Sequence, residues 1–175
     1  MLIIDNKDNW YALFVESSQE HTVKKHLESN LGETFSFLIP ERELKERRQG
    51  KWHVVKRKLF PSYVLLKGPL DINAYYKIKE TPHLIKVLKN NDEFLKIDED
   101  ELHVLNILTK KTSGKIGFST LHKIDDHIKV VDGPLLGLEG QIVKVNARKH
   151  RAKVRLRFLN EERIVELGIN VIEKI

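Results

Sequence analysis

The chain has 175 residues, which is enough for one large domain or two small ones. Hydrophobic residues make up 41% and charged residues 32%, which excludes a disordered chain because enough apolar surface is present to offset chain entropy. Lys and Arg number 31 against 25 Asp and Glu, so the formal net charge is +6. This excess leaves two readings open: a polyanionic partner such as nucleic acid, or a basic surface that is only solvated.

The absence of cysteine excludes disulfides, thiolate metal sites and cysteine nucleophiles. The apolar run at residues 1–4 is too short for a signal peptide. No stretch approaches the roughly 20 apolar residues that span a bilayer. We therefore expect a cytoplasmic protein.

The N-terminal 108 residues alternate between strand and helix patterns. Val23, Leu27 and Leu31 recur at intervals of four and predict a helix over 18–30, with Ser17-Ser18 as its N-cap. Glu101 follows Asp98 by three residues, as in a capping box. The further expected elements are strands over 10–15, 35–39, 63–66 and 84–88, a helix from Asp71 to Pro82, and a helix from Asp98 to about 108. These elements predict an α+β fold, an α/β sandwich on a mostly antiparallel sheet.

The composition changes after residue 108. Residues 109–122 contain few apolar side chains and predict a flexible linker between a domain over 1–108 and a second over 123–175. The second domain has an all-β pattern. Its expected strands lie over 128–132, 141–146, 152–158, 163–167 and 170–173. Five short strands in about 50 residues favour a small closed barrel, because closure removes exposed strand edges.

The first two of these strands carry a strand–turn–strand signature. Residues 128–135 read Ile-Lys-Val-Val-Asp-Gly-Pro-Leu, and 137–142 read Gly-Leu-Glu-Gly-Gln-Ile. This segment resembles the KOW motif of NusG and of several ribosomal proteins. Gly133 and Gly140 are expected to supply the positive φ that tight turns require. The resemblance implies an SH3-like β-barrel.

The N-terminal half resembles the NGN domain of the NusG family. Phe60-Pro61-Ser62-Tyr63-Val64 matches the family's FPGYV motif, although Ser62 replaces its glycine. Other matches in chain order are the opening strand at 10–13, the first helix at 20–27, the strand end at 39–41 and the turn at 81–84. Together with the KOW segment they cover nearly the whole chain. The resemblance implies a bacterial transcription elongation factor.

In that family the NGN domain docks an apolar face on the clamp helices of the large RNA polymerase subunit. Carried over by motif, the contact residues are Phe14, Phe60, Tyr63 and Leu65. Aromatic side chains at strand ends suit an interface, but a lone aromatic in a strand is more often a core residue. Tyr75 and Tyr76 of the second helix would face the opposite polymerase pincer. Bridging both pincers would hold the clamp closed and suppress pausing and termination.

A basic stripe in the C-terminal domain is the strongest candidate for nucleic-acid binding. Ala152, Val154, Leu156 and Phe158 alternate with cations, so the period of two places the cations on one outer face. No acid occurs between residues 144 and 157, and neighbouring cations repel each other unless an anion is near. The candidate residues are Lys129, Lys144, Arg148, Lys149, His150, Arg151, Lys153, Arg155 and Arg157. An RNA hairpin suits such a stripe, while an ordinary solvated face is the alternative.

Two weaker nucleic-acid candidates lie in the N-terminal half. A polar and basic excursion over 41–56 corresponds to a mobile hairpin loop of the family near upstream DNA, and Arg47 and Arg48 are its candidate residues. Lys24, Lys25 and His26 lie on the first helix, where specialised paralogues touch non-template DNA. Lysine on a helix is usually a solvated surface residue.

Departures from the family pattern separate two functions. The family's Phe-Gly-Arg turn, which contacts a ribosomal protein or a termination factor, is replaced by Leu159-Asn160-Glu161. The chain is therefore most similar to specialised paralogues of the LoaP antiterminator subgroup, which implies recognition of an RNA hairpin in a leader transcript. The alternative is a general NusG-type elongation factor whose KOW domain recruits a protein. No nucleophile–base pair, P-loop or histidine metal set occurs, so we expect no enzyme, no metal, no cofactor and a monomer.

Overall fold

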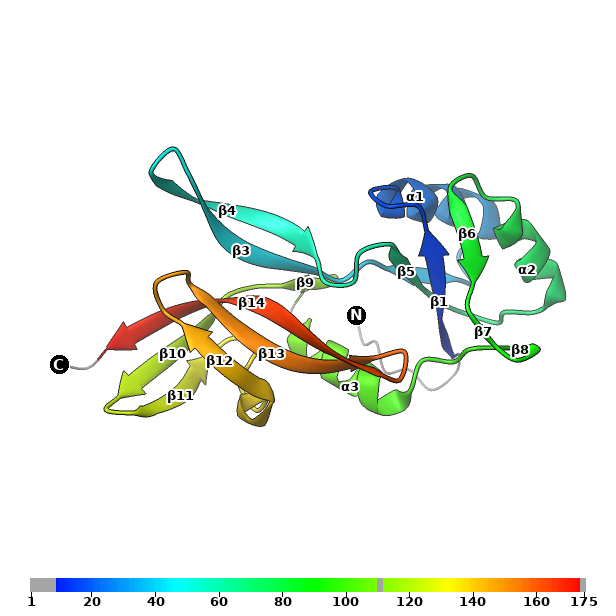
Figure 1. The fold of residues 1–175 in the computed structure, drawn as a ribbon. Coiled ribbons are helices and arrows are strands. Elements are labelled where there is room, and N and C mark those ends of the chain that lie inside the picture. Colours follow the sequence, from blue (N-terminus) through cyan, green and yellow to red (C-terminus); the bar gives the residue numbers. More distant parts are fainter. Residues whose placement is uncertain (1–8, 110–111, 174–175) are drawn as a thin grey trace. The chain divides into compact units, whose positions relative to one another are not determined.

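The computed structural model describes residues 9–109 and 112–173. The chain divides into two compact units (Figure 1). The α/β unit contains the described chain up to Ile39 together with Phe60–Glu99, and the β unit contains Pro40–Leu59 and the chain from Asp100 onward. The predicted boundary at residue 108 therefore differs from the observed division, because residues 40–59 and the third helix belong with the C-terminal strands.

The α/β unit is built on an antiparallel sheet in the order β2-β5-β1-β6. Its strands are β1 (Trp10–Val15), β2 (Ser36–Leu38), β5 (Tyr63–Lys67) and β6 (Leu84–Val87), and its helices are α1 (Glu20–Leu31) and α2 (Ile72–Lys79). One sheet face forms the core with the helices, since Leu13 and Val64 pack with Val23, Leu27 and Ile78. The short pair β7 (Lys89–Asn90) and β8 (Glu93–Phe94) follows β6. The predicted elements of this unit are confirmed.

The start of α1 differs from the predicted serine cap. Gln19 occupies the cap position and makes no side-chain cap bond, while Ser18 has a φ of 68°. The Glu20 carboxylate instead accepts hydrogen bonds from the backbone N–H groups of Ser18 and Ser62, at 3.1 and 3.0 Å. This carboxylate therefore ties the start of α1 to the turn before β5. Asp71 caps α2 as predicted, because its carboxylate accepts from the N–H of Ala74 at 2.8 Å.

The β unit carries a five-stranded sheet in the order β11-β10-β14-β13-β12. Its strands are β10 (Ser119–Ile124), β11 (His127–Asp132), β12 (Ile142–Asn146), β13 (Arg151–Phe158) and β14 (Glu161–Glu173), with a 3-10 turn at Glu139–Gln141. The predicted strands at 163–167 and 170–173 are one strand, β14. Its first part pairs antiparallel with β13 and its last part pairs parallel with β10, so the sheet needs no break in β14.

Two expectations about backbone conformation are wrong in part. Residues 115–116 form β9 (Lys115–Ile116), which pairs with β3, and β10 begins at Ser119, so much of the predicted flexible linker is strand. Ile116 and Ser119 are buried, which a solvated linker would not allow. Lys110 and Lys111, like the apolar run at residues 1–4, lie outside the described residues. Gly133 has the expected positive φ of 100°, whereas Gly140 lies in the 3-10 turn without one.

The polar segment after Pro40 is a long β-hairpin. Its strands are β3 (Glu41–Arg48) and β4 (Lys51–Lys58). The hairpin lies against β14 (Figure 1), and Gly168 of that strand permits the approach. A Cβ at Gly168 would lie 2.4 Å from the carbonyl oxygen of Glu43 and 2.5 Å from the Phe118 ring. The helix α3 (Glu99–Leu108) has the predicted extent, and Leu102, Leu105 and Leu108 form its buried face.

Candidate functional site

Strand β13 has the predicted two-sided pattern. Ala152, Val154, Leu156 and Phe158 are buried and pack in the core of the β unit. The intervening cations Lys153, Arg155 and Arg157 are exposed. The period of two in the sequence therefore places these cations on one outer face of the sheet, as expected.

The neighbouring strand β14 supplies acids to this face, which the sequence analysis did not foresee. Glu166 lies opposite Lys153, and Glu162 lies opposite Arg157. The Arg151 guanidinium bonds the Glu166 carboxylate at 2.6 Å, and Arg155 Nε bonds Glu162 at 2.9 Å. The argument that this strand's cations lack a nearby anion is therefore wrong for Arg151 and Arg155. The acids are close in space although the basic segment itself contains none.

Five other cations of β12, β13 and the turn between them are exposed and make no ion pair within the described part of the chain: Lys144, Arg148, Lys149, Lys153 and Arg157. Lys153 and Arg157 have Glu166 and Glu162 opposite them in the register but form no ion pair with these acids. Lys144 lies opposite Lys153 across the β12–β13 pair. Like charges at directly paired positions repel each other, so an anion placed between them would lower the free energy of this face. We name these five side chains the open cations.

A hollow in the sheet surface collects several of these groups. It has a volume of about 210 Å³ and is lined by Lys144, Asn146, Lys149, Arg151, Lys153 and Glu166. Four of the six lining side chains are cationic and only one is acidic. A phosphate group suits such a lining, because ammonium and guanidinium groups donate charge-assisted hydrogen bonds to its oxygens. We refer to this feature as the cationic hollow.

The Glu166 carboxylate is held ionised by its surroundings. The hydrogen bond from Arg151 lowers the pKa of Glu166 below its ordinary value, against the opposing effect of burial, and Lys153 and Arg42 contribute further positive charge. Glu166 contacts cations of two strands, because its carboxylate bonds Arg151 of β13 and its backbone carbonyl accepts from Arg42 Nη1 of β3 at 2.8 Å. Glu166 therefore joins the hairpin to the edge of the cationic hollow.

This lowered pKa gives the first testable prediction. A carboxyl group whose folded-state pKa is depressed stabilises the fold above its ordinary pKa, and that contribution is lost as pH falls through the folded value. We expect Glu166→Gln to lower the free energy of unfolding at neutral pH, and the difference from the parent protein to shrink as the pH falls below about 4. Urea unfolding at a series of pH values measures this. A difference that stayed constant across the series would contradict the ionised pairing.

The turn between β12 and β13 is built by local hydrogen bonds. Asn146 Oδ1 accepts from the N–H of Lys149 at 3.0 Å, and the N–H of His150 donates to the carbonyl of Ala147 at 3.2 Å. His150 closes the turn with a φ of 56°. Burial and the charge of Lys45 lower the pKa of His150, so its ring is neutral at neutral pH and does not add to the cations beside it.

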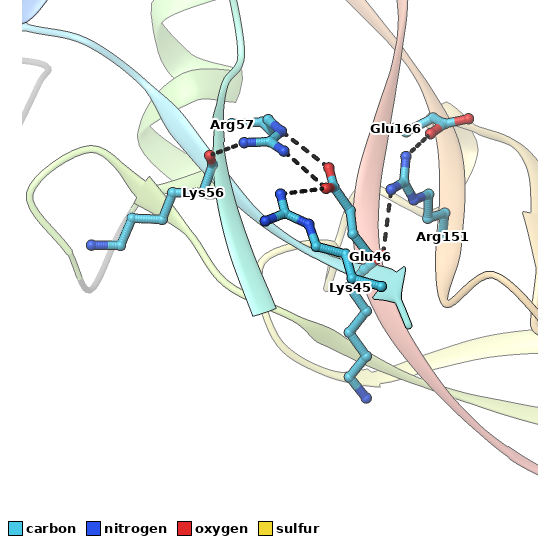
Figure 2. Close-up of polar contacts among 7 residues, drawn as sticks. Lys45, Glu46, Lys56, Arg57, Arg151 and Glu166 are labelled. Atoms are coloured by element: carbon cyan, nitrogen blue, oxygen red, sulfur yellow. Dashed lines mark hydrogen bonds and ion pairs between the residues drawn. The ribbon is translucent and has the colours of Figure 1, made fainter. Parts of the chain in front are cut away.

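Some basic residues of the hairpin form hydrogen bonds to β14 or ion pairs with Glu46, and others are exposed. Lys45 Nζ donates to Asn170 Oδ1 at 3.0 Å, and Arg151 Nη2 donates to the carbonyl of Lys45 at 3.4 Å. The Glu46 carboxylate forms an ion pair with Arg57 Nη2 at 2.8 Å (Figure 2) and another with Arg48 Nη2 at 3.4 Å. These contacts explain why a segment so rich in charge forms an ordered hairpin. Of the two predicted residues here, Arg48 is paired, whereas Arg47 is exposed and makes no ion pair among the described residues.

Lys129 lies away from the cationic hollow within the β unit. It is exposed on β11, and two strands separate β11 from β13 in the sheet order. The three candidate residues of α1 belong to the α/β unit. Lys24 pairs with Glu28 at 3.6 Å, His26 Nε2 lies 2.7 Å from Asn30 Nδ2, and Lys25 is exposed.

The four residues predicted to contact polymerase through an apolar face differ in how far they are buried. Phe14 and Tyr63 are opposite partners of β1 and β5, are partly exposed, and have ring centroids 5.4 Å apart. Phe60 and Leu65 are buried, at 2% and 0% exposure. Phe60 and Leu65 are therefore core side chains, whereas Phe14 and Tyr63 keep part of their surface exposed. Ser62, in the position of the family's glycine, has a φ of 69°.

The two tyrosines of α2 also differ from each other. Tyr76 is 57% exposed, and its ring centroid lies 5.6 Å from that of Tyr75. Tyr75 is partly buried against Phe94, at 5.3 Å, and below Lys89 Nζ, at 4.5 Å. Tyr75 therefore holds the β7–β8 segment on α2, and Tyr76 is the member of the pair that is free to meet another molecule.

Sequence reasoning missed Trp52 of β4. Its side chain is 43% exposed, and its ring lies edge-to-face against His150 at 5.0 Å. The available signal was a tryptophan inside a basic, polar segment, where no core position explains it.

No helix in the described part of the chain is long and apolar enough to cross a membrane. The described residues also contain no cluster of three metal-ligating side chains.

Comparison with known proteins places the chain among transcription factors. Residues 8–106 match the family described as "Transcription termination factor nusG". The transcription termination/antitermination protein NusG of Bacillus subtilis (strain 168) is 28% identical over 180 residues, which cover 95% of this chain and 98% of the relative. NusG of Thermus thermophilus is 28% identical over 181 residues, covering 94% and 97%.

A solved structure described as "Domain interaction in Thermotoga maritima NusG" aligns with a TM-score of 0.57 over 93% of this chain and 94% of that chain. At 21% identity, this likeness supports the fold: an N-terminal α/β unit followed by a C-terminal β domain. The family match covers more than half of the sequence, and the relatives align over nearly all of it. The chain therefore belongs to the NusG family of transcription termination and antitermination factors.

Proposed function

We propose that this protein is a specialised antitermination factor that binds RNA polymerase through its α/β unit and an RNA element through the open cations of its β unit. The observation that carries the RNA part is the set of open cations on β12, β13 and the turn between them, three of which, Lys144, Lys149 and Lys153, line the cationic hollow. Phosphate contacts supply most of the affinity of such surfaces, and guanidinium groups also donate to base edges. An RNA hairpin in a leader transcript, read in the cytoplasm, is the proposed ligand.

The polymerase part rests on the Phe14–Tyr63 pair and on exposed Tyr76. Aromatic side chains that are partly exposed in the free protein bury apolar area on docking and are common interface hot spots. Two contacts on opposite sides of the transcribing enzyme would keep its clamp closed and disfavour paused states. The protein would act by binding alone, without making or breaking a covalent bond.

The turn between β13 and β14 supports a specialised role rather than the general one. Leu159 and Asn160 both have positive φ, and the Asn160 N–H donates to the Glu101 carboxylate at 3.2 Å. The aromatic and basic residues that the family uses here for protein partners are absent. A general adaptor that recruits a protein is the second candidate. Val143 and Ile164, which are 48% and 49% exposed on this domain, favour it.

An electrophoretic mobility shift series separates these functions. We expect Lys153→Glu with Arg157→Glu to weaken binding of a leader hairpin by on the order of 100-fold, because each lost charge-assisted hydrogen bond costs about 1.5 kcal/mol or more. The slope of log affinity against log salt should fall by about 2. The matched control is Lys77→Glu with Lys123→Glu, which makes the same charge change at exposed lysines outside the candidate set and should have a small effect.

The control for sequence is a scrambled hairpin of the same length. Preference for the leader sequence supports RNA recognition, whereas equal and strongly salt-dependent binding of both supports the general factor. Equal losses from the two double variants would show that only net charge matters. Undiminished binding by the Lys153→Glu, Arg157→Glu variant would refute the proposed site.

A further inference from the structure

Trp52 occupies an unusual place for a large apolar side chain. It lies near the tip of the β3–β4 hairpin, opposite Arg47 in the register, and is 43% exposed. The neighbouring position on the same face, Val54, is 58% exposed. The chain's other tryptophan, Trp10, is 1% exposed. The hairpin therefore displays an indole ring to solvent where burial would have lowered the free energy.

The indole ring packs against a histidine ring of the β12–β13 turn. His150, at the end of the β12–β13 turn, meets it edge-to-face with centroids 5.0 Å apart and planes at 86°. The pKa of His150 is lowered by burial and by Lys45, so the contact is made by a neutral ring. The hairpin is already tethered by the Lys45–Asn170 and Arg42–Glu166 hydrogen bonds. Trp52 is thus positioned without being enclosed.

The nearest charged residues of the hairpin face and of the turn are basic. Arg47 lies opposite Trp52 on the same face of the hairpin. Arg148 and Lys149 precede His150 in the turn, and Lys149 also lines the cationic hollow. The nearest acid in the hairpin strands is Glu46, which lies opposite His53 in the register. This register places Glu46 on the other face of the hairpin from Arg47 and Trp52. On that face its carboxylate forms ion pairs with Arg57 (Figure 2) and with Arg48.

We propose that Trp52, backed by His150, is a stacking site for an unpaired base of a single-stranded nucleic acid whose phosphates follow Arg47, Lys149 and the cationic hollow. An exposed aromatic ring among cations is the arrangement that binds single strands, because every base has a π-face and the cations follow the backbone. Base-paired nucleotides keep their faces stacked on each other, so a duplex gives the ring nothing to stack on. An RNA loop or a strand end therefore fits this site.

This inference rests on the proposed nucleic-acid function and adds a second element to it. The hairpin and the β12–β13 turn, which are about 100 residues apart in sequence, would bind one ligand together. Phosphate contacts at the hollow give affinity for any backbone, and Trp52 adds selectivity for an unpaired base.

Tryptophan fluorescence of the full chain tests the site directly. Trp10 is buried, so quenching by an added nucleic acid reports on Trp52. We expect a short single-stranded oligo(A) RNA to quench the emission, and the same strand annealed to its complement to leave it unchanged. Trp52→Ala should lower single-strand affinity about tenfold and leave duplex affinity unaltered, while Trp52→Phe should keep most of the affinity.

The outcomes separate this site from the proposed function. Single-strand binding without quenching and without an effect of Trp52→Ala overturns the stacking site. The proposed function then still stands if Lys153→Glu with Arg157→Glu weakens binding. Equal quenching by strand and duplex also overturns it, because the ring would then meet the backbone. Failure of the parent protein to bind the oligo(A) strand, its duplex and the leader hairpin removes both this site and the RNA part of the proposed function. Hydrogen exchange of the β3–β4 amides in Trp52→Ala shows that the hairpin remains formed.

Discussion

Phe14→Ala and Tyr63→Ala are each expected to weaken binding to core RNA polymerase by about 30-fold, because truncating an interface hot spot costs about 2 kcal/mol or more. The two rings form one partly exposed pair with centroids 5.4 Å apart, on strands whose register places them directly opposite each other. Removing either ring also exposes the other, so the double variant should lose less than the product of the single effects. Titration of labelled protein with core polymerase measures the loss.

The control for this experiment is Ile172→Ala, which removes a side chain that is 48% exposed on β14 of the β unit. Its affinity for polymerase should stay within about threefold of the parent value, since surface substitutions away from an interface have small effects. Thermal unfolding of each variant shows that the sheet survives. If both aromatic variants bound polymerase as tightly as the parent while folded, the docking face would lie elsewhere on the α/β unit.

Gly168→Ala is expected to lower the free energy of unfolding of the β unit by about 1–3 kcal/mol, the usual cost of overpacking. The added Cβ would lie 2.4 Å from the carbonyl oxygen of Glu43 and 2.5 Å from the Phe118 ring. A backbone oxygen cannot turn aside as a flexible side chain does, so β3 must move away from β14. Such a shift would strain the hydrogen bonds that Arg42 and Lys45 make to β14.

Gly117→Ala is the matched control for this change. A Cβ at Gly117 meets nothing within 4 Å, so the same substitution should leave stability within about 0.5 kcal/mol. Urea unfolding gives the stabilities, and hydrogen exchange of the β3 amides reports whether the hairpin has moved. Equal effects of the two glycine variants would mean that the hairpin does not depend on close packing at Gly168.

The packing at Gly168 changes how the hairpin's basic residues are understood. Arg42 and Lys45 donate hydrogen bonds to residues of β14. Arg48 and Arg57 form ion pairs with Glu46. These four cations hold the hairpin together and against the β domain. Near its tip, Arg47 and Lys51 are exposed and make no ion pair within the described part of the chain, and Trp52 is 43% exposed beside them.

The pattern of β13 shows what local sequence could predict. The alternation from Ala152 to Phe158 fixes which side chains enter the core, because successive residues of a strand point to opposite faces. The Asp71 cap and the helix faces of α1 and α3 were predicted for the same reason, since each depends on neighbours three or four positions away. Local periodicity did not show that residues 163–173 form one strand, because β14 changes partners along its length.

The amino-acid sequence by itself determined that this chain has an α/β half and a β half with a cationic strand, and its motifs identified the family. Only the tertiary structure decided which cations are open. Glu162 and Glu166 reach Arg155 and Arg151 through the pairing of β13 with β14. The burial of Phe60 and Leu65 and the contact of Trp52 with His150 were also decided there. The physical reason is that charge pairing, burial and ring contacts depend on distances between residues far apart in the chain, and these are set by register and packing.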